Sequence, residues 1–240
     1  MITAKDFSEF TASRRSTRDF LPTPVERSVI DEIIADALTA PSWSNTRPFM
    51  VAVASGEQRD RISAEFCSRW EAVAAARRGG LLGKLKLLIN RRGLPTTHRL
   101  IARPYPNDLK PRSIKVGKQL YEVLGVARND ADARDAHWRR NYEFFGAPTV
   151  LFIFAHKSFG LFSASDAGMF TQNITLSAHA RGLGTVAQGA YSIWGDVPTR
   201  EFNVPKQYQY LYGIAIGHPS QHPVNDFKAE RLPASEITLN

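Results

Sequence analysis

The spacing of apolar and polar residues predicts a chain of helices interrupted by a few short strands. Thr3-Ala-Lys-Asp6 is typical of a helix start, and this helix is expected to end near Ser13. A second start is predicted at Thr23-Pro-Val-Glu26, with a hydroxyl at the cap, proline at the first helical position and glutamate three residues on. Apolar residues then recur at helical spacing: Val29, Ile30, Ile33, Ile34, Ala37 and Leu38. This stripe predicts a helix with one buried face, ended by Pro41.

Four short apolar runs predict strands, and longer periodic stretches predict further helices. FMVAVA (49–54) and TVLFIFA (149–155) are expected to be buried strands, GTVAQGAY (184–191) a strand with a turn, and YLYGIAIG (210–217) a last core strand. Helices are predicted over 57–76, 81–89, 116–126 and 163–181, with a proline-broken loop at 102–113 and an irregular tail from His218. Because helices dominate, an α+β fold with a small sheet is favoured over a doubly wound sheet.

The composition is that of a folded globular protein in a reducing compartment. Of the 240 residues, 43% are hydrophobic and 22% are charged, which suits one sizeable core. The single cysteine, Cys67, excludes a disulfide framework and a multi-cysteine metal site, and we expect it to be a small buried apolar residue. The N-terminal MITAKDFSEF lacks the apolar core of a signal peptide, and no apolar run is long enough to span a membrane. These features predict a soluble, cytoplasmic protein.

The positive charge of the chain is concentrated in one internal segment. The whole chain has a net charge of +8, but residues 77–115 hold eleven Lys or Arg and one Asp or Glu, a local charge of +10. The remainder therefore carries −2. We interpret this segment as a solvated arm, as a device that favours anionic ligands in a nearby pocket, or as a surface for nucleic acid or membrane.

Several common catalytic and binding signatures do not occur in the sequence. Gly182, Gly184 and Gly189 lack the spacing of a dinucleotide-binding loop, and Lys84 is not followed by the hydroxyl residue of a phosphate loop. His218 and His222 are each followed by proline, so no helix aligns them, and no metal site is predicted. A G-x-S-x-G nucleophile elbow is also missing.

Three polar clusters carry the remaining chemistry. They are RRSTR (14–18), PSWSNTRP (41–48) and NDFKAERLP (225–233). Arginine pairs bidentately with phosphate, and a serine hydroxyl donates to the same oxygen atoms. The hydroxyl, amide and indole groups of the second cluster suit a flat heteroaromatic ring. The clusters are therefore candidates for an anionic, aromatic ligand, although a charge run such as RRSTR is more often a solvated surface.

In their order along the chain, these clusters resemble the FMN-dependent nitroreductase family. The pattern R-R-S-x-R-x-F matches Arg14 to Phe20, G-L-G-T-x-x-Q-G matches Gly182 to Gly189, and G-x-A-I-G-x-P with P-V-N-x-F-x-x-x-R matches Gly213 to Arg231. The loop A-P-S-x-x-N-x-Q-P matches Ala40 to Pro48, except that Arg47 stands where the family usually has glutamine. The basic stretch and the element YEVLGVARND…NYEFFGAP are similar to a nitrobenzoate-reductase-like subgroup.

The resemblance implies an architecture as well as a cofactor. It implies one nitroreductase-like domain over residues 1–240, with three layers and a small, mainly antiparallel central sheet surrounded by helices. The basic segment at about 77–115 would be an insert of helices and loop over the pocket. A tail from about 218 would embrace a second subunit, which implies an intertwined homodimer.

The resemblance also implies which residues hold FMN. Arg14 and Ser16 would bind the phosphate, with Arg15 beside them and Arg231 and Lys228 joining from the tail. Arg18 would face the N1/O2 edge of the flavin, where a cation stabilises the reduced anionic ring. Backbone groups of Gln188 and Gly189 would lie near N5. The other subunit would supply Ser42, Trp43 and Asn45. Arg47 departs from the family pattern, and we expect it to contact the substrate and favour anionic partners: NADPH over NADH, or an aromatic acceptor with a carboxylate.

The implied activity is electron transfer from NAD(P)H through FMN to a nitroaromatic or similar electron-poor acceptor. Both substrates would use one pocket in turn by a ping-pong mechanism, and no side chain is expected to act as a catalytic acid or base. The expected partners are a second subunit and a small aromatic acceptor, without nucleic acid or membrane. Three alternatives stay open: a flavoenzyme of the same fold with a non-nitro substrate, of the dehalogenase or flavin-consuming type; a basic protein that binds nucleic acid or a membrane surface; and a flavin-binding protein without turnover.

Overall fold

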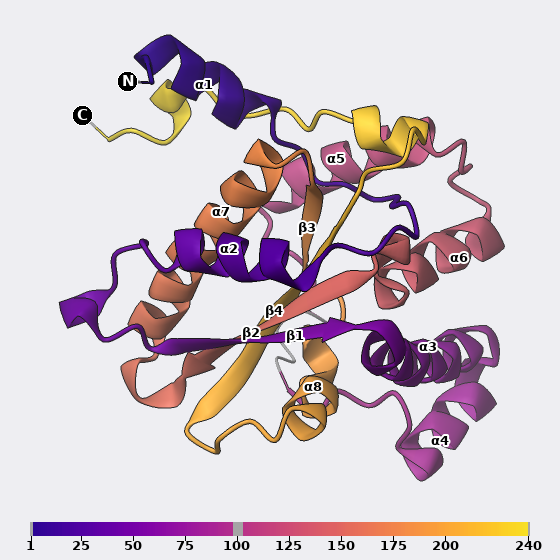
Figure 1. The fold of residues 1–240 in the computed structure, drawn as a ribbon. Coiled ribbons are helices and arrows are strands. Elements are labelled where there is room, and N and C mark those ends of the chain that lie inside the picture. Colours follow the sequence, from indigo (N-terminus) through magenta and orange to yellow (C-terminus); the bar gives the residue numbers. More distant parts are fainter. Residues whose placement is uncertain (1, 98–102, 240) are drawn as a thin grey trace.

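The computed structural model describes residues 2–97 and 103–239, and its centre is a four-stranded antiparallel sheet. The strands are β1 (Phe49–Ser55), β2 (Thr149–His156), β3 (Gly184–Gln188) and β4 (Tyr208–Gly217), in the order β1-β2-β4-β3 (Figure 1). The predicted strands are confirmed, but the prediction that β1 is buried is wrong. Only Phe49 and Ala54 of β1 are buried, because β1 is an edge strand that the surrounding helices cover incompletely.

Helices cover both faces of the sheet. Alternate residues of β2 point to opposite faces, so Leu151 and Ile153 pack in one core cluster while Phe152 and Phe154 pack in another. The first cluster lies under α2 (Arg27–Ala37) and α7 (Leu161–Ala180), and the second under α3 (Gly56–Arg78). This arrangement of helix, sheet and helix confirms the predicted α+β layers.

The remaining helices differ in how well the sequence predicted them. Helix α1 (Ala4–Ser13) begins with the expected capping box between Thr3 and Asp6, and α4 (Gly80–Asn90) is also confirmed. Helix α5 (Lys110–Val123) begins earlier than predicted, because Pro111 lies in its first turn, where a missing N–H costs nothing. The sequence did not predict α6 (Ala131–Tyr142) and α8 (Asp196–Glu201). Residues 98–102, where the predicted loop begins, lie outside the described residues.

The predicted start of α2 at Thr23 and Pro24 is wrong. The helix begins at Arg27, and Glu26, in the cap position, makes no side-chain cap hydrogen bond. Tertiary pairing explains the difference, because Phe20 N–H donates to Phe145 O at 3.3 Å and Leu21 N–H donates to His218 O at 2.9 Å. These bonds hold the chain extended before the proline, and proline is equally compatible with an extended backbone.

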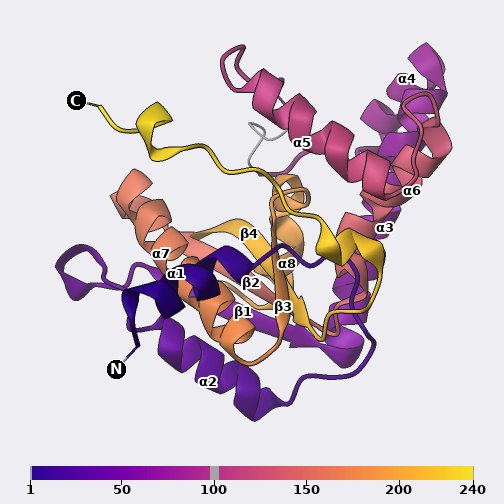
Figure 2. The ribbon, with the colours of Figure 1, turned by 90° about the horizontal axis from the view of Figure 1, so that it is seen from above.

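The N-terminal segment and the C-terminal tail meet beside β3 (Figure 2). Thr17 N–H donates to Thr185 O at 2.9 Å, which adds the segment to the free edge of the sheet. Asn225 joins the tail to the same segment, since its Oδ1 accepts from Arg18 N–H at 2.8 Å and its Nδ2 donates to Asp19 O at 2.8 Å. As predicted, the tail contains only short turns.

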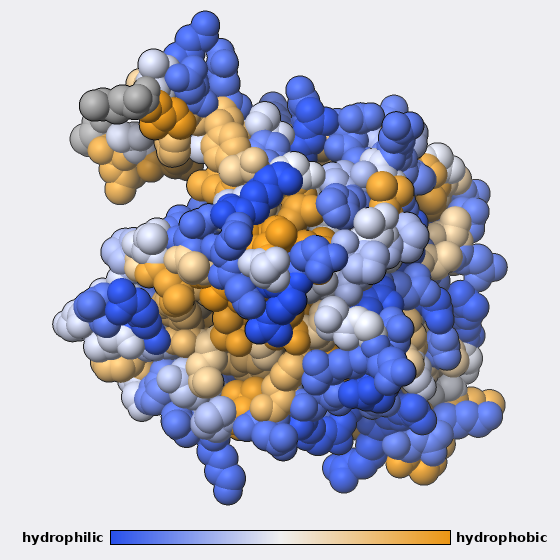
Figure 3. All heavy atoms as spheres, viewed as in Figure 1, coloured by the Kyte–Doolittle hydropathy of each residue, from blue (hydrophilic) through white to orange (hydrophobic). Residues whose placement is uncertain are grey.

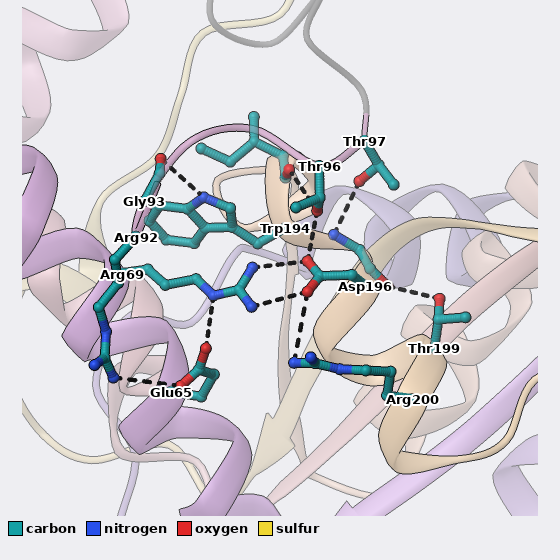
Figure 4. Close-up of polar contacts among 12 residues, drawn as sticks. Glu65, Arg69, Arg92, Gly93, Thr96, Thr97, Trp194, Asp196, Thr199 and Arg200 are labelled. Atoms are coloured by element: carbon teal, nitrogen blue, oxygen red, sulfur yellow. Dashed lines mark hydrogen bonds and ion pairs between the residues drawn. The ribbon is translucent and has the colours of Figure 1, made fainter. Parts of the chain in front are cut away.

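A largely buried ion-pair network fixes the middle of the basic segment, residues 93–97, to α3 and α8 (Figure 4). Arg69, 9% exposed, donates to both carboxylate oxygens of Asp196 at 2.7 and 2.8 Å. Thr96 Oγ1 donates to the same carboxylate at 2.5 Å, and the backbone N–H groups of Thr96 and Thr97 donate to Ile193 O at 2.7 and 3.0 Å. The network therefore ties residues 93–97 to the turn that follows β3.

Cys67 is buried on α3, as predicted, and burial raises the pKa of its thiol. Such a thiol is a poor nucleophile at neutral pH. Over the described ranges, none of the helices is both long and apolar enough to cross a membrane.

Candidate functional site

The segment RRSTR leaves α1 as an extended chain along β3. Arg14 is the C-cap of α1 with an extended backbone, and Ser16 forms a parallel bridge with Thr185. Successive residues of an extended chain point to opposite sides. Arg15 and Thr17 make contacts on one side, since Arg15 pairs with Asp226 at 3.4 Å and Thr17 packs against Gly184. The alternation therefore places Ser16 and Arg18 on the other side, whereas Arg14, at the end of α1, lines a cavity together with Arg15 and Thr17.

Two arginines that are 217 positions apart in the sequence lie close together in the fold. Partial burial, and then the positive charge of Arg231, lower the pKa of Arg14. The Arg231 side chain is exposed, and its guanidinium donates only to the nearby carbonyls of Ala229 and Glu230, at 2.9 and 3.3 Å. In the part of the chain that is described, no carboxylate pairs with either arginine. The two cations therefore form an electrostatic site for an anion.

Arg18 is a further cation without a carboxylate partner among the described residues. Burial lowers its pKa, and its guanidinium donates to Ser16 O at 3.3 Å. Beside it, burial, then Arg18 and Arg140, lower the pKa of His137 to about 4. The imidazole is therefore neutral at physiological pH. No sequence pattern indicated His137, because it is a lone histidine in a helix that was not predicted.

A groove begins next to this pair. The ring of His137 meets the ring of Tyr121 edge-on at 5.5 Å, and the guanidinium of Arg134 lies 5.5 Å from the centre of the same Tyr121 ring. Helix α5, residues 126–128 and the start of α6 enclose a groove of about 740 Å³, with Lys118, Arg128 and Arg134 in its lining. The lining combines apolar residues with these three cations and one carboxylate, that of Glu122, and its net positive charge suits an apolar anion.

Gln188 and Gly189 lie at the end of β3, on the edge of the sheet that RRSTR follows. The Gln188 side chain is buried, where its Nε2 donates to Asn141 O at 2.9 Å and its Oε1 accepts from the Tyr191 hydroxyl at 3.3 Å. The side chain is thus occupied inside the protein, and the backbone is what this position offers to a ligand. Gly189 is exposed.

The loop with Ser42, Trp43, Asn45 and Arg47 does not meet the arginines within one chain. Trp43 N–H donates to Asp166 near the start of α7 at 3.0 Å, whereas His179 near its end lies beside Arg14 and Arg15. These two points are thirteen residues apart on one helix, a distance of about 20 Å. Figure 1 accordingly shows the loop projecting from the molecule at the end of α7 away from β3.

The loop is held in an unusual backbone conformation. Ser44, Asn45 and Arg47 have φ of 47°, 56° and 45°, in the left-handed region that residues other than glycine seldom adopt. Ser42 Oγ accepts from Arg47 N–H at 3.0 Å and helps to hold this shape. The Trp43 ring is 49% exposed and packs edge-on against the equally exposed Phe162 at 4.2 Å. Strain of this kind concentrates at functional sites.

Comparison with known proteins identifies the family of this chain. The model of the Nitroreductase family matches residues 11–218. A 4-nitrobenzoate reductase of Pseudomonas putida is 30% identical over 97% of this chain and 94% of its own length, and a nitrobenzene nitroreductase of Ectopseudomonas oleovorans is 28% identical over 99% and 98%. The crystal structure of the FMN-dependent nitroreductase NfnB from Mycobacterium smegmatis in complex with NADPH superposes with a TM-score of 0.80, at 27% identity, over 99% of this chain and 98% of that one. The resemblance seen in the sequence motifs is thereby confirmed, and the chain belongs to the nitroreductase family.

Proposed function

We propose that this protein binds FMN and passes electrons from NAD(P)H to a nitroaromatic or similar electron-poor acceptor. One observation carries the proposal: Arg14 and Arg231 come together from the two ends of the chain without a carboxylate between them among the described residues. A phosphate monoester supplies the charge that these cations lack. The names of the relatives, which include nitrobenzene and nitrobenzoate reductases, support the acceptor class.

The residues present fit FMN along the edge of the sheet. Arg14, Ser16 and Arg231 would bind the phosphate, and the exposed Lys228 lies three residues before Arg231 on the same tail. Arg15 would support the site from behind, because its own guanidinium is already tied to Asp226. When bound, FMN supplies the hydride-transfer chemistry.

Arg18 would place its positive charge at the N1/O2 edge of the ring and stabilise negative charge there. A neutral His137 beside it adds no further positive charge to those of Arg18 and Arg140, and the imidazole can still donate a hydrogen bond. The backbone of Gln188 and Gly189 would face N5, since the Gln188 side chain is used internally.

The decisive experiment is the absorbance spectrum of the purified protein before and after anaerobic NADPH. We expect a bound flavin spectrum that bleaches with NADPH and returns when 4-nitrobenzoate is added. A colourless protein that cannot be loaded with FMN would refute the proposal. Bound flavin that neither NADPH nor NADH reduces would instead support a flavin-binding protein without turnover. Flavin that is reduced but not reoxidised by nitroaromatics would favour a non-nitro substrate.

We also infer that the site is completed by a second copy of the chain. Ser42, Trp43 and Asn45 lie about 20 Å from the arginines along α7, so they can complete the site only from a neighbouring subunit. The exposed Trp43 and Phe162 offer apolar surface for such a contact. The tail extends away from the body of the protein in Figure 2, and its Ile237 and Leu239 are 70% and 98% exposed.

Truncation of the tail tests the dimer separately from the phosphate site. A chain that ends at Pro233 keeps Lys228 and Arg231 but loses the exposed Ile237 and Leu239. We expect sedimentation velocity to show a dimer for the full chain and a shift toward monomer after truncation, with weaker flavin binding as a consequence. A truncated chain that stays dimeric would show that residues 234–240 do not hold the subunits together.

Arg47 is proposed to favour acceptors that carry a carboxylate. Its guanidinium is exposed and makes one long hydrogen bond, to Asn45 O at 3.4 Å, so it is available to a ligand. We expect Arg47→Gln to lower kcat/KM for 4-nitrobenzoate about tenfold relative to neutral nitrobenzene, with the preference also weakening as salt rises. An unchanged ratio of the two substrates would remove Arg47 from the substrate site.

A further inference from the structure

Helix α4 presents five large aliphatic side chains to solvent. Their exposed fractions are 85% for Leu81, 73% for Leu82, 53% for Leu85, 61% for Leu88 and 69% for Ile89. At 100° per residue these positions fall within an arc of about 120°, so they form one continuous stripe. Figure 3 shows apolar atoms at the outer edge of the molecule where Figure 1 places α4. A water-exposed apolar stripe of this kind marks an interaction surface.

The stripe faces away from the rest of the protein. Helix α4 packs on α3 through Gly83, where a methyl group would fall 2.8 Å from Ala76 O. Gly83 lies about 160° around the helix from the centre of the stripe. The side of α4 opposite the stripe therefore packs on α3, and the stripe remains exposed to solvent. It is not needed to attach the helix.

The charged residues of α4 and those that directly follow it are all positive, although Arg92 pairs with Glu65 of α3 at 3.6 Å. Lys84 and Lys86 are exposed and flank the stripe on its two sides, and Arg91 and Arg92 follow the helix. The sequence has no Asp or Glu anywhere from 72 to 107, while the same stretch holds eight Lys or Arg. A helix with an apolar face bordered by lysines is typical of a helix that lies in a membrane interface. Anionic lipid headgroups are the matching partner.

We propose that α4 binds the protein to the surface of anionic lipid bilayers, with the stripe inserted among the acyl chains and the lysines at the headgroups. This revises the expectation from the sequence that no membrane is a partner. Pairing of α4 with α4 of a second copy would bring like charges together, and a nucleic acid would leave the aliphatic stripe exposed. In Figures 1 and 2, α4 lies on the opposite side of the molecule from α1, α7 and the 42–47 loop, so lipid contact leaves the phosphate end of the proposed flavin site, beside α1, open.

The test is binding of the full-length, FMN-loaded protein to vesicles, measured by co-sedimentation. We expect binding to phosphatidylcholine vesicles with 30% phosphatidylglycerol, little binding to pure phosphatidylcholine, and weaker binding at 500 mM NaCl than at 50 mM. Lys84→Gln/Lys86→Gln should weaken binding roughly fivefold for each lysine removed. Leu82→Gln/Leu85→Gln should weaken it at least tenfold. Both replaced leucines are exposed, so the thermal midpoint should not fall; Leu88→Gln/Ile89→Gln serves if this pair fails to fold.

A matched control tests whether vesicle binding depends on α4 itself or on exposed aliphatic and lysine side chains in general. Ile2→Gln/Lys5→Gln removes one exposed aliphatic residue and one exposed lysine from the N-terminal segment, where Ile2 is 68% exposed, and should not change vesicle binding. Two results would overturn the proposal. One is no binding to anionic vesicles, or binding that the leucine substitutions do not weaken. The other is a change in sedimentation coefficient without lipid on substitution of the stripe, which would assign this face to contact between copies of the chain.

Discussion

Replacing Asp196 with alanine is expected to destabilise the protein by about 3–5 kcal/mol. The carboxylate binds both terminal nitrogens of Arg69, at 2.7 and 2.8 Å, and the side chain of Arg69 is only 10% exposed. Without Asp196, the guanidinium keeps Glu65 on its Nε at 2.8 Å but loses the carboxylate at its other end. A buried cation left partly unpaired costs far more than the pair itself contributes. The measurement is the urea midpoint of the variant against wild type at pH 7.

Two comparisons test whether this loss of stability comes from a buried charge left without its partner. The double change Arg69→Met/Asp196→Leu removes the pair without leaving a charge and should be much less harmful than Asp196→Ala alone. Arg61→Ala breaks an exposed pair, with Glu201, in the same region and should cost less than about 1 kcal/mol. If Asp196→Ala costs no more than Arg61→Ala, the network of Figure 4 does not stabilise the fold in the way its geometry indicates.

The same carboxylate predicts a pH dependence. Burial alone would raise the pKa of Asp196, but hydrogen bonds from Arg69 and Thr96, with the charge of Arg69, outweigh burial and hold the pKa below its ordinary value of 3.8. A carboxyl group with a depressed folded pKa stabilises the protein above that ordinary value, and the contribution is lost as pH falls through the folded pKa. The difference in stability between wild type and Asp196→Ala should therefore shrink below about pH 4 and stay constant above it.

The sequence predicted the layers of the fold better than the network that holds them. Apolar runs identified all four strands. Strands β2, β3 and β4 are largely buried and have few polar residues, and the edge strand β1 is apolar although the helices cover it incompletely. Helices α6 and α8 were not predicted. Helix α6 has charged residues on most of its sides and so shows no apolar stripe, and α8 is only six residues long. The contacts of Asp196 could not be found either. Asp196 lies 127 positions from Arg69 and 100 positions from Thr96, and only the fold brings these residues together.

The site was predicted in part, for a physical reason. The arginine clusters were named because arginine suits phosphate, the family resemblance then selected Arg14 and Arg231, and the fold brings the two together. His137 carries no recognisable pattern, since its importance comes from Arg18, which lies 119 positions away. The separation of the 42–47 loop from the arginines also depends on tertiary structure. It follows from the length of α7, which no spacing in the loop itself reveals.

Removing both Arg14 and Arg231 is expected to abolish retention of FMN through dialysis. Each charged contact to phosphate contributes about 1.5–3 kcal/mol, which corresponds to a roughly ten- to hundredfold change in dissociation constant. The double variant should therefore lose between roughly a hundredfold and ten-thousandfold in affinity. Titration of apoprotein with FMN, followed by flavin fluorescence, gives the dissociation constants of the single and double variants.

The substitutions that weaken FMN binding should not lower the thermal stability of the apoprotein. This contrast distinguishes a phosphate site from a cluster that only stabilises the fold. Arg231 lowers the pKa of Arg14, so each guanidinium makes the charge of the other less favourable while no anion is bound. Arg231→Ala relieves that repulsion, and the thermal midpoint of its apoprotein should be equal to or slightly above that of wild type. Arg15→Ala removes the same charge from the side that faces Asp226 and should weaken FMN binding much less than Arg14→Ala. If Arg14→Ala and Arg231→Ala lower apoprotein stability but leave the FMN dissociation constant unchanged, these arginines stabilise the fold and do not bind the phosphate.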